Sequence, residues 1–206
     1  MRAVYDEVGE AYAARFFDEL DHKPYDRRRL DEFADRCRDD GLVLDVGCGP
    51  GHVARYLRER GVDAEGIDLS PATVAVARRL TPGLAVRVGD LTALDVADDS
   101  VAGIVAFYSL IHLPRASLPV AVRELHRVLR PGGVLLVALH GGSGEAHADE
   151  FCGQPVAVDA TLYSADELSR RLAEGGLAVE AVLSRPPYDF EHPTERLYAW
   201  ATKPSD

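Results

Sequence analysis

A glycine-rich segment, Gly47-Cys48-Gly49-Pro50-Gly51, is the part of the sequence best suited to hold a ligand. It follows a short apolar run at 42–46 and precedes a stretch in which Val53 and Leu57 recur with helical spacing. In a strand–turn–helix unit, glycines let the backbone come close to a ligand, and the N–H groups at the start of the helix point towards it. The segment therefore predicts a nucleoside-binding site.

An acidic residue, Asp68, stands at the end of the next predicted strand. A carboxylate about 20 residues after a glycine loop can accept hydrogen bonds from both hydroxyl groups of a ribose. The glycine spacing then separates two kinds of nucleoside cofactor. A dinucleotide fingerprint reads Gly-x-Gly-x-x-Gly, whereas here Gly51 comes one residue too early and His52 follows it. The spacing therefore disfavours a nicotinamide dinucleotide.

The elements around these residues alternate between strand and helix. Apolar runs predict strands at 42–46, 62–67, 85–88, 102–107, 134–139, 177–183 and 196–202. Such alternation predicts an α/β fold with a doubly wound, Rossmann-like and mostly parallel seven-stranded sheet. The last two strands have no helix between them, which an antiparallel pair accommodates most easily. We therefore expect one antiparallel strand, at the far end of the sheet.

The length of 206 residues agrees with one domain. Helical spacing predicts two helices within 1–40, which would form an N-terminal lid on a core at 41–206. The polar, glycine-rich stretch at 141–162 is expected to be a loop that belongs to the same lid. Ser164 and Glu167 have the spacing of a capping box at the start of a helix.

Composition and charge limit the kinds of partner. The chain has 34 acidic and 23 basic residues and a net charge of −11, whereas nucleic-acid-binding proteins usually show a basic excess. No apolar run reaches the roughly 18 residues of a membrane helix, and the N-terminus lacks a secretion signal. The three cysteines show neither disulfide nor metal spacing. We expect a cytoplasmic protein that binds no nucleic acid, membrane or metal.

Several segments, in order along the chain, resemble the motifs of class I S-adenosylmethionine-dependent methyltransferases. They are Leu44–Gly51, Gly66–Ser70, Gly89–Leu91, Phe107–Pro114 and Leu129–Gly133. The tail is more loosely similar to small bacterial enzymes that methylate small molecules. The resemblance implies S-adenosylmethionine as cofactor. It also implies methyl transfer to an oxygen or nitrogen of a small-molecule acceptor, in bacterial specialised metabolism.

The resemblance also implies a set of cofactor-binding residues: Tyr12, Asp45, Gly47, Cys48, Gly49, Asp68, Leu69, Asp90, Leu91 and Phe107. Asp45 would hold the glycine loop and approach the amino group of the methionine part, and Asp68 would accept the ribose hydroxyls. Asp90 would accept from the adenine amino group, with a turn acid as the alternative. Tyr12 would close over the methionine carboxylate, with a core aromatic as the alternative.

Methyl transfer needs few catalytic groups, because the methyl group on a sulfonium is already activated and the nucleophile needs mainly positioning, about 3 Å away. A base helps where the acceptor must lose a proton, and histidine suits this role. His112 and His140 follow the fourth and fifth predicted strands, and Tyr108 lies near them. These three are the candidate catalytic or acceptor-binding residues, and for His112 a helix cap is the alternative.

Three other functions stay open. A catalytically silent S-adenosylmethionine-binding regulator would keep the same glycine loop and Asp68. A nicotinamide-dependent oxidoreductase is disfavoured by the glycine spacing, and aminopropyl transfer on the same fold is more remote. A metal site from His140, His147, Asp149 and Glu150 is disfavoured by irregular spacing.

Overall fold

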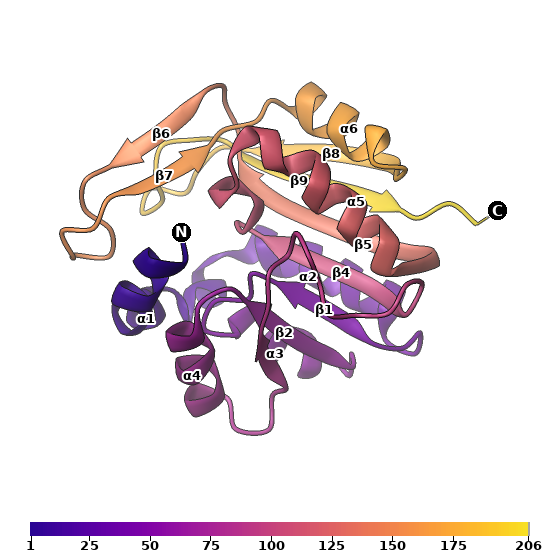
Figure 1. The fold of residues 1–206 in the computed structure, drawn as a ribbon, viewed down its shortest axis with the longest axis horizontal. Helices are drawn as coiled ribbons and strands as arrows, with labels where there is room; N and C mark the ends of the chain where they lie inside the picture. The colour runs from indigo at the N-terminus through magenta and orange to yellow at the C-terminus, as the bar shows by residue number, and fades with distance from the viewer. Residues whose placement is uncertain (206) are drawn as a thin grey trace.

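One seven-stranded sheet forms the centre of the protein in the computed structural model, which describes residues 1–205 (Figure 1). The strands of this sheet are β1 (Val43–Val46), β2 (Ala64–Asp68), β3 (Val86–Val88), β4 (Val101–Phe107), β5 (Leu129–His140), β8 (Ala178–Arg185) and β9 (Arg196–Thr202). They lie in the order β3-β2-β1-β4-β5-β9-β8, and β9 runs antiparallel to both of its neighbours. The predicted α/β class and its seven strands are confirmed.

The position of the antiparallel strand differs from the prediction. Strand β9 lies between β5 and β8 and not at the far end of the sheet. The reason is visible in the burial of the two strands. Residues 196–201 of β9 are all buried, as an inner strand requires, whereas β8 is largely exposed or half-buried and suits an edge.

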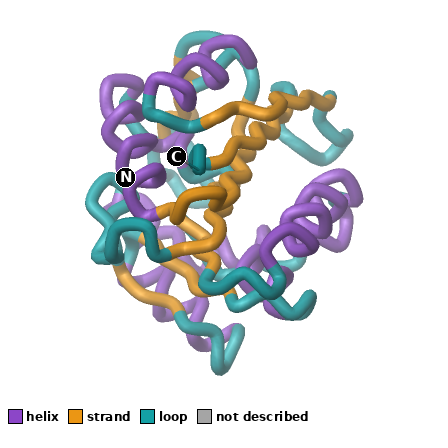
Figure 2. The backbone as a smooth tube through the Cα atoms, turned by 90° about the vertical axis from the view of Figure 1, so that its right-hand side faces the viewer, coloured by secondary structure: helices purple, strands orange, loops and turns teal. Residues whose placement is uncertain are grey.

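Helices cover both faces of the sheet (Figure 2). Helices α2 (Pro24–Cys37) and α3 (His52–Arg58) pack on one face together with Val43 and Val105. Helices α5 (Leu118–Val128) and α6 (Ala165–Glu174) pack on the other face with Leu44 and Ile104. Successive strand residues point to opposite faces, so each apolar run of β1 and β4 supplies two cores.

Helix starts follow the sequence signals in part. Helix α4 (Pro71–Leu80) begins with the side chain of Ser70 accepting a hydrogen bond from the N–H of Thr73 at 3.0 Å. At the start of α6, Ser164 Oγ accepts from the N–H of Glu167 at 3.1 Å. The Glu167 carboxylate pairs with Arg115 at 2.5 and 2.6 Å. Only the serine half of the expected capping box is therefore seen.

A helix and a two-stranded hairpin lie at the carboxyl ends of the strands, on the side of the molecule opposite the C-terminus (Figure 1). Helix α1 (Arg2–Phe16) packs against α4, where Asp6 accepts from the Ser70 hydroxyl at 2.7 Å. The expected loop at 141–162 contains an antiparallel hairpin, β6 (Glu145–Ala148) and β7 (Val158–Thr161). That prediction was wrong because the hairpin is short and rich in alanine and acidic residues, which have weak strand propensity.

A membrane-spanning helix is not found among residues 1–205, since none of their helices is both long and apolar enough.

Candidate active site

The glycine turn after β1 forms a closely walled cradle. Gly47 and Gly49 have φ values of +71° and +54°. A Cβ atom on Gly47 would lie 2.2 Å from the Cβ of Ser109, and one on Gly49 would lie 3.2 Å from Cε1 of Tyr12. Glycine is therefore required at Gly47 by both conformation and space.

Asp68 ties the end of β2 to this turn. Its Oδ2 accepts from the N–H of Gly49 and its Oδ1 from the N–H of Ser70, both at 2.9 Å. Burial raises the pKa of Asp68, and the two backbone donors act against that rise. Because each carboxylate oxygen has a second lone pair, the group can still accept one hydrogen bond on each oxygen. Two adjacent ribose hydroxyls would match this capacity.

Asp45 lies under the turn. It is 1% exposed and accepts from the N–H of Ala54 in the first turn of α3 at 3.0 Å. Gly51 at the N-cap has no side chain to do this, so Asp45 caps α3 from the neighbouring strand. Burial raises its pKa to about 7, while the charge of His52 lowers it. Asp45 is thus placed to hold the glycine turn.

A cleft of about 100 Å³ follows the turn, and we call it the glycine-turn cleft. All of the predicted cofactor residues except Asp45 and Cys48 line it. The side chain of Cys48 packs behind the turn, where a Cβ on Gly66 would come within 2.7 Å of its Sγ. The sequence interpretation that Cys48 lies against the cofactor can therefore hold only for its backbone.

The residues of the glycine-turn cleft fit an adenosyl cofactor. Leu69 is 38% exposed and offers an apolar surface next to Asp68. Asp90 Oδ1 accepts hydrogen bonds from the N–H and the hydroxyl of Thr92, at 2.8 and 2.6 Å, so Asp90 stabilises its own turn. Its other carboxylate oxygen, Oδ2, takes no part in these two hydrogen bonds. The buried hydroxyl of Ser109 has no hydrogen-bond partner within residues 1–205. It is a polar group that a bound ligand could satisfy.

Helix α1 covers much of this cleft. Met1, Arg2, Tyr5 and Tyr12 of the N-terminal segment line it. Small-molecule sites usually measure about 300–1,000 Å³, so a whole adenosyl cofactor needs more room than this cleft alone provides. The geometry supports the proposal that the N-terminal helix acts as a lid.

A larger cavity of about 460 Å³ adjoins the cleft, and we call it the histidine-lined cavity. Its walls come from α1, the β6–β7 hairpin and the segment 190–196. Five of the seven histidines line it: His22, His112, His140, His147 and His192. The cleft and the cavity share a wall made by Tyr5, Tyr12, Tyr108 and His112. A volume of this size suits a small molecule next to the cofactor cleft.

His112 lies in this shared wall. Its Nε2 is 2.7 Å from the hydroxyl of Tyr5, and its Nδ1 is 3.2 Å from the carbonyl oxygen of Asp159 in β7. Burial lowers its pKa to about 4, although the bond to the carbonyl raises it. The ring is therefore neutral at pH 7, as a proton acceptor must be.

His140 and Tyr108 differ in what they present to the cavity. His140 Nδ1 is 2.7 Å from the hydroxyl of Thr194, and burial together with the charge of Arg196 lowers its pKa to about 3. The Tyr108 ring lines both spaces, but its hydroxyl lies 3.5 Å from Asp26 Oδ1, and burial raises its pKa. The geometry favours Tyr108 as a wall of the site over Tyr108 as a base.

A buried ion network behind this wall was not predicted. Arg185 pairs with Asp26 at 2.9 Å and with Glu191 at 2.6 Å, and Lys23 reaches Glu191 at 3.2 Å. Burial raises the pKa of Glu191, but Arg185, the N–H of Tyr188 and Lys23 together hold it at about 2. The network joins α2 to the segment between β8 and β9. Because Asp26 and Arg185 are 159 residues apart in sequence, no local pattern reveals their pairing.

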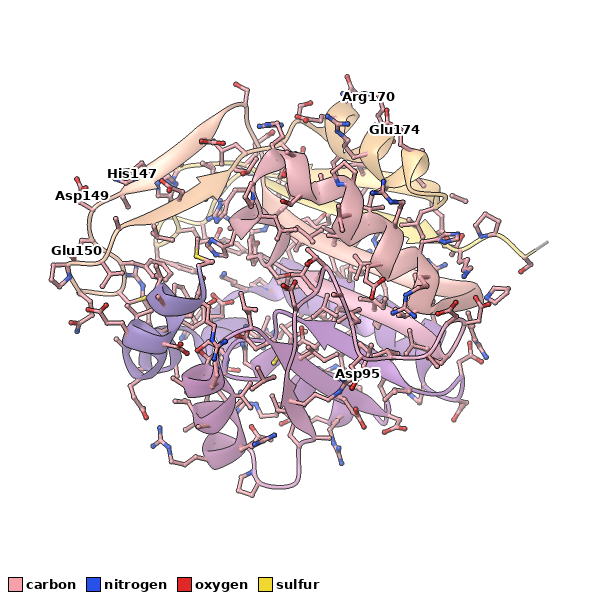
Figure 3. The ribbon with its side chains drawn as sticks, viewed as in Figure 1. Asp95, His147, Asp149, Glu150, Arg170 and Glu174 are labelled. Carbon is pink, nitrogen blue, oxygen red and sulfur yellow. The ribbon has the colours of Figure 1, made fainter. Side chains whose placement is uncertain are left out.

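The histidine at the hairpin has two acidic neighbours. His147 Nδ1 is 2.6 Å from Asp159, and its Nε2 is 3.2 Å from Asp149. Figure 3 shows His147, Asp149 and Glu150 together at the β6 end, far from Arg170 and Glu174 on α6. Within residues 1–205 no group of three or more histidine, cysteine or acidic side chains could hold a metal ion.

Acidification is expected to destabilise the fold through His112 and His140. In an unfolded chain a histidine has a pKa of about 6.5. In the folded protein the pKa is about 4 for His112 and about 3 for His140. Below pH 6.5 the unfolded chain binds more protons, so the free energy of unfolding falls as the pH falls. The raised pKa of Asp45 has the opposite effect over part of this range.

Urea unfolding at pH 7.5 and pH 5.0 measures this effect. The loss of stability between the two pH values should be clearly smaller in the double variant His112→Asn/His140→Asn than in the unsubstituted protein. Asp45 is the same in both proteins, so the comparison isolates the histidines. An equal loss in both would contradict the assignment.

Residues 43–133 match a family described as methyltransferase domain. This match covers less than half of the chain. Together with the strand order, the glycine turn and Asp68, it supports the resemblance to class I S-adenosylmethionine-dependent methyltransferases. S-adenosylmethionine is the cofactor of this family.

Proteins that are similar to this chain in sequence or in fold are named as methyltransferases. A malonyl-[acyl-carrier protein] O-methyltransferase of Serratia marcescens is 35% identical over 122 residues, which are 53% of this chain and 47% of that protein. Methyltransferase GfsG of Streptomyces halstedii is 43% identical over 103 residues, or 47% and 36% of the two chains. The chain thus matches about half or less of these relatives' length. The crystal structure of an S-adenosylmethionine-dependent methyltransferase of Methanosarcina mazei shares the fold, with a TM-score of 0.75 at 19% identity over 84% of this chain and 97% of that one.

Proposed function

We propose that this protein transfers a methyl group from S-adenosylmethionine to an oxygen or nitrogen of a small molecule, in bacterial specialised metabolism. The observation that carries the proposal is the histidine-lined cavity. It has the volume of a small-molecule site and meets the glycine-turn cleft at a wall shared by four residues. An acceptor in this cavity would lie next to the methyl donor.

The chemistry of the cavity supports an acceptor that gives up a proton. When bound, S-adenosylmethionine supplies a methyl group that is already activated as an electrophile. The protein then has to place the acceptor, keep water away and receive a proton. His112 and His140 are both neutral at pH 7 and both line the cavity. The names of two relatives, a malonyl-[acyl-carrier protein] O-methyltransferase and a ubiquinone biosynthesis O-methyltransferase, favour oxygen as the acceptor atom.

Formation of S-adenosylhomocysteine tests the proposal. The purified protein is incubated with S-adenosylmethionine and, separately, catechol, octanoic acid, a malonyl thioester, tryptamine or transfer RNA. We expect at least one small molecule to give S-adenosylhomocysteine and a product heavier by one methyl group, and the RNA to give none. Tight cofactor binding without turnover of any acceptor would favour the silent regulator instead.

Replacing His112 or His140 with alanine is expected to lower turnover more than cofactor affinity. General acid–base groups contribute about 10²- to 10⁴-fold to catalysis, whereas neither side chain is needed to hold Asp68 or the glycine turn. Steady-state kinetics gives kcat, and calorimetry with S-adenosylhomocysteine gives the affinity. His22→Ala, in the same cavity but away from the shared wall, is the control. If both variants keep full kcat, neither histidine is the base.

A further inference from the structure

The wall between the glycine-turn cleft and the histidine-lined cavity contains one hydrogen-bonded pair of reactive groups. The hydroxyl of Tyr5, on α1, lies 2.7 Å from Nε2 of His112, and the two ring centroids are 5.4 Å apart. Both side chains line both spaces. The pair therefore stands where a methyl donor in one space would face an acceptor in the other.

The neighbours of the pair determine where the protons lie. Nδ1 of His112 faces the carbonyl oxygen of Asp159, which can only accept a hydrogen bond. Nδ1 must therefore carry the proton of the neutral ring, and Nε2 keeps its lone pair. It follows that the Tyr5 hydroxyl donates to Nε2. Its oxygen still has lone pairs with which to accept a hydrogen bond from a molecule in the cavity.

We propose that Tyr5 is a catalytic residue, which passes the proton of the methyl acceptor to His112. This inference rests on the proposed function and restricts the acceptor to molecules that present an ionisable O–H or N–H group at the shared wall. The proton of the acceptor moves to the Tyr5 oxygen while the original Tyr5 proton moves to Nε2 of His112. Tyr5 ends as a neutral phenol and His112 as an imidazolium. The positive charge of the methyl donor is lost as the methyl group is transferred, so the total charge is conserved.

A weakly basic imidazole is sufficient for this step. As the acceptor oxygen or nitrogen gains the methyl group, its own proton becomes much more acidic, so the proton moves readily to a neutral ring. The Asp159 carbonyl then stabilises the imidazolium through the Nδ1–H bond. Other titratable groups that influence the pair are the amino terminus, Asp68, Cys152 and His140. Burial raises the pKa of Tyr5, so the residue relays a proton as a phenol and is not a tyrosinate base.

The proton positions can be tested without turnover. The probe is the ¹⁵N-histidine NMR spectrum at pH 7 of the protein bound to S-adenosylhomocysteine. We expect His112 to carry its proton on Nδ1, and Tyr5→Phe to shift the Nε2 resonance of His112 while that of His140 stays in place. Tyr56→Phe, on α3 and outside both spaces, should leave both resonances unchanged. A proton on Nε2 in the unsubstituted protein, or no shift in Tyr5→Phe, would overturn the proposal.

The second measurement is kcat with whichever acceptor gives S-adenosylhomocysteine in the turnover test above. Tyr5→Phe should lower kcat about 10²-fold or more. The affinity for S-adenosylhomocysteine and the melting temperature should change little, because the ring remains. Full kcat in Tyr5→Phe would overturn the relay and leave the proposed function intact. If no acceptor turns over in the unsubstituted protein, the proposed function fails, and the NMR result alone decides whether the Tyr5–His112 pair exists.

Discussion

Replacing Asp68 with alanine is expected to weaken S-adenosylhomocysteine binding by about 1–3 kcal/mol, the cost of unmade hydrogen bonds to a charged acceptor. This corresponds to a roughly ten- to hundredfold larger Kd. The effect has two sources. The ribose would lose its acceptor, and the N–H groups of Gly49 and Ser70 would lose theirs, which would loosen the turn. Isothermal titration calorimetry measures the change.

A matched control separates this effect from a general change of charge. Asp95 (Figure 3) is exposed and does not line the cleft, so Asp95→Ala removes one negative charge without touching the site. The affinity of Asp95→Ala for S-adenosylhomocysteine should equal that of the unsubstituted protein. Unchanged affinity in Asp68→Ala would refute the ribose assignment, whatever the control shows.

Gly47→Ala is expected to abolish cofactor binding and to lower the melting temperature. A left-handed backbone costs a non-glycine residue about 1–2 kcal/mol. In addition, the new Cβ would stand 2.2 Å from the Cβ of Ser109, a distance that requires the backbone to move. Because the turn itself shapes the cleft, any such movement displaces the groups that would contact the cofactor. Calorimetry and thermal unfolding measure the two losses.

Two variants separate strain from collision. Gly83 has φ +87° and nothing within 4 Å of an added Cβ, so Gly83→Ala carries the backbone strain alone. Gly83→Ala should lower the melting temperature slightly and leave the affinity for S-adenosylhomocysteine unchanged. The double variant Gly47→Ala/Ser109→Gly removes the collision and should recover part of the stability of Gly47→Ala. Equal behaviour of Gly47→Ala and Gly83→Ala would show that the tight contact with Ser109 does not matter.

Local patterns predicted the sheet and the glycine turn because both depend on short segments. The apolar runs of β1 and β4 and the Ser70–Pro71 helix start are recognisable without any partner. The order of the last strands depends on which strand is more buried, a property of the whole sheet. The β6–β7 hairpin was missed since its residues resemble those of a loop.

The site was predictable where motifs exist and not elsewhere. Gly47, Asp68 and Asp90 were predicted from motif resemblance, and they line the same cleft. Tyr5 was missed, although its position seven residues before Tyr12 places both on one face of a helix. The ion network of Asp26 and Arg185 could not be predicted, because only the folded chain brings these residues together.

The hydrogen bond from His112 to the carbonyl oxygen of Asp159 joins the shared wall to the β6–β7 hairpin. An acceptor too bulky for the cavity would push the hairpin outwards and break this bond. The imidazole would then be free to rotate or to change tautomer, and it would no longer be poised to receive a proton. Discrimination against large molecules would consequently appear as slow turnover of bound acceptor more than as weak binding.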